Sequence, residues 1–127
     1  MRTKPYTWTS KNRFSTYLSV MHMNKKEIYT QLFSYNWPQA EELINYANSK
    51  KGYGGDDGCY GVTYPSDLDE YDREVEKIII PEGYLEINYW HEGNQDIHVT
   101  EKEYILELKK HLISTGNSAL TEKLKNA

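Results

Sequence analysis

The sequence of 127 residues contains a single cysteine, Cys59, and no long apolar run. One cysteine excludes an internal disulfide framework. The densest apolar string, residues 78–80, stops at Pro81, well short of the roughly 18 apolar residues that a membrane-spanning helix needs. The basic residues near the N-terminus are not followed by an apolar stretch of signal-peptide length. We therefore expect a cytoplasmic protein that does not insert into a membrane.

Acidic residues are missing from one part of the chain. The first 26 residues hold six Lys or Arg and no Asp or Glu, whereas residues 27–100 hold fifteen acids and four bases. An acidic middle repels the phosphates of nucleic acid and attracts basic partners. The N-terminal bases are scattered, which is typical of a solvated surface. The charge pattern argues against direct nucleic-acid binding.

The length indicates one domain, residues 1–127, that can bury a core without disulfides. The hydrophobic content of 38%, with twelve tyrosines, also argues against a disordered chain. Residues 1–23 are ambiguous because "PYTWT" and "FSTYLSVMHM" are rich in Thr and aromatic residues but also contain helical spacing. We favour a strand in this segment.

Three segments carry helix signals. Asn24 with Glu27, and Thr100 with Glu103, form capping-box patterns, and Gly52 and Gly116 stand where two of the helices would end. The predicted helices cover residues 25–35, 38–51 and 101–115, and a last turn begins near residue 118.

Four short segments carry strand signals: residues 59–64, 76–80, 84–90 and 96–99. In the third segment Leu85 and Ile87 share one face and polar residues occupy the other, as in a half-buried strand. Helices, then strands, then a helix indicate an α+β fold. We predict a small antiparallel sheet, a meander of about four strands, packed with three to four helices.

Residues 52–76 combine five glycines, four tyrosines and eight carboxylates with one base, Arg73. The glycines do not make a phosphate cradle, because Asp56 and Asp57 stand where a P-loop needs Lys and Ser or Thr. The dinucleotide fingerprint fails as well, since its third glycine is missing. We interpret the glycines at positions 52, 54 and 55 as a flexible turn that uses glycine's access to positive φ.

Metal and cofactor sites are not predicted. Asp67, Asp69 and Asp72 resemble the start of a calcium loop, but Asp72 stands where that loop needs glycine and Ile78 where it needs a bidentate Glu. Two histidines, at positions 91 and 98, are too few for a zinc site. We expect no metal and no cofactor.

Residues 52–76 have the composition of a binding surface. Tyrosine gives a large contact area with a polar tip and is enriched at interfaces. Clustered carboxylates steer a basic partner into place. We predict Tyr64 and Tyr71 as anchors and five carboxylates as charge contacts: Asp67, Asp69, Glu70, Asp72 and Glu74.

Catalysis is not the favoured reading of the chain. Cys59 has no nucleophile motif around it. Glu86 or Glu92 with His91 would suit a small hydrolase, but the sequence shows no sign that a carboxylate is desolvated there. We predict a protein that is not an enzyme. A small hydrolase stays open as a less favoured alternative, and so does a regulatory adaptor that binds a basic protein.

Short motifs between residues 40 and 115 resemble one group of bacterial proteins. They are a helix running into Gly52-Tyr53-Gly54, the step Tyr64-Pro65, the acid-rich loop 67–76, and Val99, Glu101 and Tyr104 at the start of the last long helix. This pattern resembles the immunity proteins of contact-dependent growth inhibition, in particular the ribonuclease-toxin immunity group. Lys77 stands where we expect that pattern to have a glycine.

The resemblance implies a protein without turnover. Immunity proteins of this group bind the toxic domain of an effector delivered by a sibling cell, in the cytoplasm, and block its active site. A toxin that cuts RNA presents basic residues to phosphates, so a carboxylate-rich surface can mimic its substrate. The implied partner is a cognate nuclease toxin domain.

Overall fold

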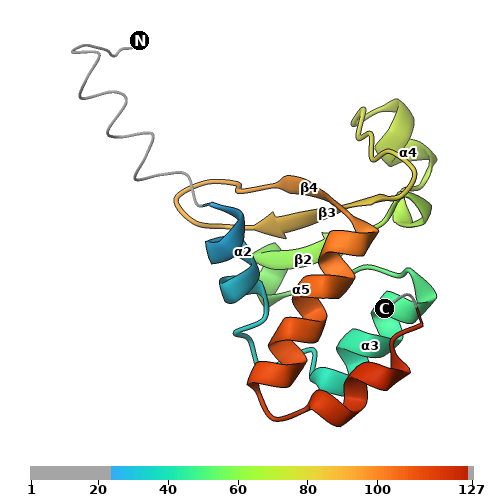
Figure 1. Cartoon of the computed structure of the whole chain (residues 1–127). Helices are drawn as coiled ribbons and strands as arrows, with labels where there is room; N and C mark the ends of the chain where they lie inside the picture. The colour runs from blue at the N-terminus through green and yellow to red at the C-terminus, as the bar shows by residue number, and fades with distance from the viewer. Residues whose placement is uncertain (1–23, 126–127) are drawn as a thin grey trace.

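The structure is a computed structural model that describes residues 24–125. The strand predicted within residues 1–23 lies outside this range. Figure 1 shows the helices and strands of this range. They are α2 (Lys25–Leu32), α3 (Ala40–Ser49), β1 (Tyr53–Gly55), the 3-10 turn η1 (Asp56–Gly58), β2 (Tyr60–Thr63), η2 (Pro65–Asp67), α4 (Glu70–Glu74), β3 (Tyr84–Tyr89), β4 (Ile97–Thr100), α5 (Glu101–Ser114) and η3 (Ser118–Lys123).

The four strands form one antiparallel sheet in the order β1-β2-β3-β4, so each strand pairs with its neighbour in the sequence. This is the predicted meander, and the predicted α+β fold is confirmed. Because strands alternate in direction, the β1–β2 and β3–β4 loops lie at one end of the sheet. The segment that joins β2 to β3, which contains α4, lies at the other end (Figure 1).

The core lies between one face of the sheet and the helices. Leu85 and Ile87 of β3 are 0% exposed, and their neighbours Val62 and Val99 on β2 and β4 are buried beside them. This is the alternation that the sequence predicts for β3. α2, α3 and α5 contribute most of the rest of the same hydrophobic cluster. Truncating a fully buried leucine of this kind costs about 2–5 kcal/mol.

Two strand predictions need correction. Residues 76–80, predicted as a strand, have no strand structure: Lys77 takes a left-handed φ of 59° and turns the chain, and Ile79 is exposed. The missing strand is β1, in the stretch predicted as a flexible glycine turn. Gly52 is needed at its start because a Cβ there would collide with the Val62 backbone oxygen. Of the five glycines in residues 52–76 only Gly58 has a positive φ, at 87°, while Asp56 and Asp57 just before it take positive φ values of 51° and 56°.

The predicted helices are present with shifted ends. The Asn24–Glu27 capping box is formed in both directions, as predicted. α2 ends at Leu32 rather than at residue 35, and Tyr35 instead stacks on Tyr60 with 3.7 Å between ring centroids. The aromatic stack thus continues the core where the helix stops.

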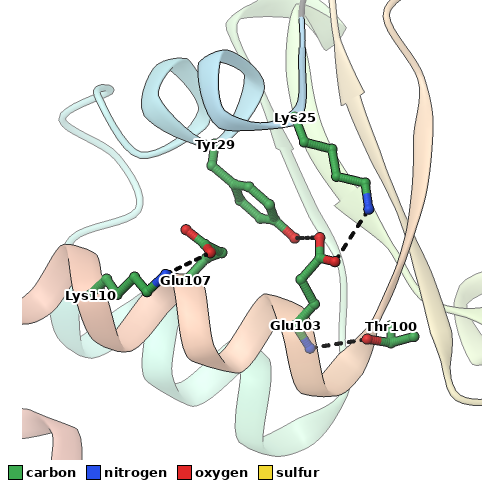
Figure 2. A network of polar contacts seen from close by, with 6 residues as sticks. All are labelled: Lys25, Tyr29, Thr100, Glu103, Glu107 and Lys110. Atoms are coloured by element: carbon green, nitrogen blue, oxygen red, sulfur yellow. Dashed lines mark hydrogen bonds and ion pairs between the residues drawn. The ribbon is translucent and has the colours of Figure 1, made fainter.

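A polar network joins α2 to the first turn of α5 (Figure 2). The Tyr29 hydroxyl donates to Glu103 Oε2 at 2.9 Å, and Lys25 Nζ lies 3.2 Å from Glu103 Oε1. The Glu103 backbone N–H donates to Thr100 Oγ1 at 3.1 Å, which caps α5. Burial and the neighbouring Glu103 carboxylate raise the pKa of Tyr29, so its hydroxyl stays a donor. This network fixes the crossing of α2 over α5.

Replacing Tyr29 with Phe tests this junction. The Tyr29→Phe variant loses one hydrogen bond to a charged acceptor. We therefore expect its free energy of unfolding, measured by chemical denaturation, to be about 1–2 kcal/mol lower than that of the wild type. Tyr71→Phe is the matched control because the Tyr71 side chain is exposed. Equal free energies of unfolding for the two variants would show that the Tyr29–Glu103 bond does not stabilise the fold.

Candidate partner-binding surface

Residues 69–79 form a segment that stands away from the core, and we call it the α4 protrusion. It is held between two buried residues, Leu68 (8% exposed) and Ile80 (7% exposed). None of the residues between them is buried. Figure 1 shows α4 beyond the ends of β2 and β3, apart from the other helices. The protrusion therefore contributes little to the core and is free to contact another molecule.

Local capping explains why this short segment is ordered as a helix. The Asp69 side chain accepts from the Asp72 backbone N–H at 2.8 Å, and Asp72 Oδ2 accepts from the Asp69 backbone N–H at 3.1 Å. Carboxylates at the start of a helix also favour its dipole. At the other end the left-handed Lys77 turns the chain, and the Ile78 backbone N–H donates to the Asp72 carbonyl at 2.9 Å. These hydrogen bonds stabilise the chain at both ends of α4.

The protrusion exposes three large apolar side chains. Tyr71 is 58% exposed, Val75 is 59% exposed and Ile79 is 75% exposed. Tyr71 and Val75 lie one helical turn apart and so point to the same side of α4. Apolar side chains gathered on a solvent-facing segment are typical of a protein interaction site.

Carboxylates surround these apolar side chains. The protrusion holds five acids and two bases, Arg73 and Lys77, within residues 69–79. All five carboxylates reach the solvent, with Asp72 half-buried. Opposite charge on a partner would be attracted over about 8–10 Å at moderate ionic strength. An apolar centre with an acidic rim suits a partner that has an apolar recess bordered by Lys or Arg.

The predicted anchor Tyr64 is not an exposed side chain of this surface. Its side chain is 3% exposed, because Tyr60, Val62 and Tyr64 alternate toward the covered face of the sheet. Burial raises the pKa of the Tyr64 hydroxyl. Of the four tyrosines in residues 52–76, Tyr71 is the exposed one. The sequence signal for the burial of Tyr64 was the strand period of two that it shares with Tyr60 and Val62.

Asp67, a predicted charge contact, has a structural task. Its Oδ2 accepts from the backbone N–H groups of Gly52 and Tyr64, each at 2.8 Å. It thereby ties the start of β1 to the end of β2 at the base of the protrusion. Its carboxylate is already engaged by the fold, although the residue is exposed.

The structure brings the other five predicted residues together on the protrusion. Glu70, Tyr71 and Glu74 are exposed, whereas Asp69 and Asp72 use carboxylate oxygens to cap α4. Val75 and Ile79 were not predicted as site residues; Ile79 lies in residues 76–80, which were predicted as a strand. Two sequence signals could have found them: the acidic pair Asp69 and Asp72 at capping-box spacing, and Tyr71 with Val75 at helical spacing.

The residues of the hydrolase alternative lie elsewhere. His91 Nε2 and Glu92 Oε2 are 3.7 Å apart, and both side chains are exposed on the β3–β4 loop. Glu86 pairs with His98 instead, at 3.2 Å across the uncovered face of the sheet. The structure thus brings His91 to Glu92 but in contact with solvent, without the burial that tunes an acid–base pair.

Three further observations describe residues 24–125 and the chain as a whole. Within that range no group of three or more His, Cys, Asp or Glu side chains could hold a metal ion. No helix in the same range is both long and apolar enough to cross a membrane. Comparisons of the chain with family models, with characterised proteins and with solved structures found no match.

Removing the Asp67 carboxylate should destabilise the fold. In Asp67→Ala two backbone N–H groups lose a charged acceptor, and we expect the free energy of unfolding to fall by about 2 kcal/mol. Glu74→Ala is the control, since no hydrogen bond of Glu74 side-chain atoms is formed within the described residues. Chemical denaturation of both variants measures the difference, and a loss in Asp67→Ala no larger than in Glu74→Ala would contradict the structural task of Asp67.

Proposed function

We propose that this protein is an immunity protein that binds a nuclease toxin domain and blocks its active site with the α4 protrusion. The observation that carries the proposal is the protrusion itself. It presents Tyr71, Val75 and Ile79 to the solvent within an acidic rim, and the core does not need any of them. The protein acts by binding, without turnover.

A protruding shape fits the recess of an enzyme better than a flat surface would. The β2–β3 connection leaves the sheet at Leu68 and returns at Ile80, so the segment between them can enter a cleft while the sheet stays outside. Its apolar side chains would fill the recess and exclude water, which is how interface hot spots gain most of their free energy. The buried residues Leu68 and Ile80 keep the ends of the protrusion in place, which lowers the entropic cost of binding.

The charge of the protrusion suits a nuclease. Enzymes that cleave RNA or DNA hold phosphates with Lys and Arg. Carboxylates such as Glu70 and Glu74 occupy the same basic groups without offering a bond to cleave. Attraction between unlike charges also speeds association, as a toxin that has entered a cell requires.

The motifs of residues 40–115, which resemble those of ribonuclease-toxin immunity proteins, support the same proposal, and so does the acidic middle of the chain. The proposed encounter takes place in the cytoplasm, where such toxins act. In that group the immunity gene lies directly downstream of its toxin gene. The toxin domain is therefore the C-terminal domain encoded immediately upstream of this chain.

Co-expression with that upstream domain tests the proposal. We expect cells to survive when both chains are made and to die when the toxin domain is made alone, and we expect a stoichiometric complex on purification. Death in the presence of this chain would refute the immunity function. Binding without an effect on toxicity would favour the adaptor alternative.

Truncating the apolar side chains of the protrusion should weaken the complex. For Tyr71→Ala with Val75→Ala we expect a dissociation constant at least about 30-fold higher, since interface anchors contribute about 2 kcal/mol or more. Leu106→Ala with Ile113→Ala is the matched control, because these side chains are equally exposed but lie on α5. Calorimetric titration of both double variants decides, and a similar loss in both would show that the protrusion is not the interface.

Reversing charge on the protrusion should slow association. Glu70→Lys with Glu74→Lys leaves the caps at Asp69 and Asp72 intact, and we expect an association rate roughly tenfold lower and less sensitive to salt. Glu41→Lys with Glu122→Lys makes the same change in net charge at exposed positions away from the protrusion. Stopped-flow mixing at several salt concentrations compares them, and equal slowing would mean that only net charge matters.

A further inference from the structure

A cleft of about 300 Å³ lies between the α4 protrusion and the body of the protein. Its charged lining comes from four separate elements of the chain. The end of α3 supplies Lys50, α4 supplies Arg73, the residues before β3 supply Glu82, and the first turn of α5 supplies Glu101. Ser66 adds a hydroxyl group. The cleft is large enough for one or two side chains of another protein.

Two of the four charges neutralise each other. Lys50 Nζ lies 3.2 Å from Glu101 Oε1. Arg73 and Glu82 differ from this pair, because within residues 24–125 neither has an oppositely charged side chain at ion-pairing distance, and they do not pair with each other. Both side chains are exposed. The cleft therefore offers one unpaired cation and one unpaired anion.

Arg73 does not fit the simple picture of an acidic surface that attracts a basic partner. It is the one base among eight carboxylates in residues 52–76. A guanidinium offers five N–H donors in a planar fork that matches a carboxylate in two parallel hydrogen bonds. Tyr71 and Val75 lie on a different side of α4 from Arg73, which is two residues from each. Arg73 is thus placed to bind a group that enters the cleft, behind the apolar side of the protrusion.

We propose that the cleft binds an acidic side chain of the partner at Arg73 and a neighbouring basic side chain of the same partner at Glu82. This inference rests on the proposed partner-binding function. An acid beside a base is the arrangement that complements both unpaired charges, whereas a group of one sign is attracted by one of them and repelled by the other. The cleft would thereby select one partner among many basic proteins.

Two variants with the same change in net charge separate this proposal from general attraction. Arg73→Glu and Lys26→Glu each replace an exposed base by an acid, and Lys26 lies on α2, so it neither lines the cleft nor belongs to the protrusion. Attraction of a basic partner by net charge alone would tighten binding in both variants. We expect Arg73→Glu to raise the dissociation constant of the toxin complex roughly tenfold or more, and Lys26→Glu to leave it unchanged or lower it. Circular dichroism checks that both variants keep the fold.

Tighter or unchanged binding in Arg73→Glu would overturn the proposal. A second, partner-free experiment covers the case in which the wild-type protein binds no toxin domain, which would refute the proposed function. Here the probe is the dipeptide N-acetyl-Asp-Lys-amide, followed through the Nε–Hε resonance of Arg73 in NMR spectra. A saturable shift with this dipeptide, and none with N-acetyl-Asn-Gln-amide, would support the cleft as a binding site. Identical spectra with both dipeptides would overturn it.

Discussion

The packing of β3 against α5 is the constraint on which the rest of the structure depends. Leu85 and Ile87 on the strand, and Leu108 and Leu112 on the helix, are all 0% exposed. β3 lies between β2 and β4, so the register of the sheet is set through it. Because β3 is held this firmly, the chain before it can leave the sheet and return without loosening the core.

The α4 protrusion is ordered without a hydrophobic core of its own. Its order comes from bonds within itself and from its two ends, and not from side chains buried along it. Carboxylates in such a segment serve different purposes that composition does not distinguish. Asp67 ties strands together and Asp69 starts a helix, whereas Glu70 and Glu74 reach the solvent.

Much of the fold could be predicted from local sequence patterns, and less of the surface could. The helices follow from capping pairs and apolar stripes, and the burial of Leu85 and Ile87 follows from strand alternation. β1 was missed because its glycines read as a turn, although close approach to the β2 backbone requires Gly52. Tyr64 was predicted to be exposed because tyrosine suits both cores and interfaces, and the strand period of two that turns it toward the core was not applied to it.

The buried residues Leu68 and Ile80, at the two ends of the α4 protrusion, have a consequence for substitutions between them. Since no residue between them is buried, substitutions in residues 69–79 would change the exposed surface with little effect on how the protein folds. The capping positions and the turn at Lys77 set the few internal requirements. One short segment can thus be exchanged while the scaffold that carries it stays the same.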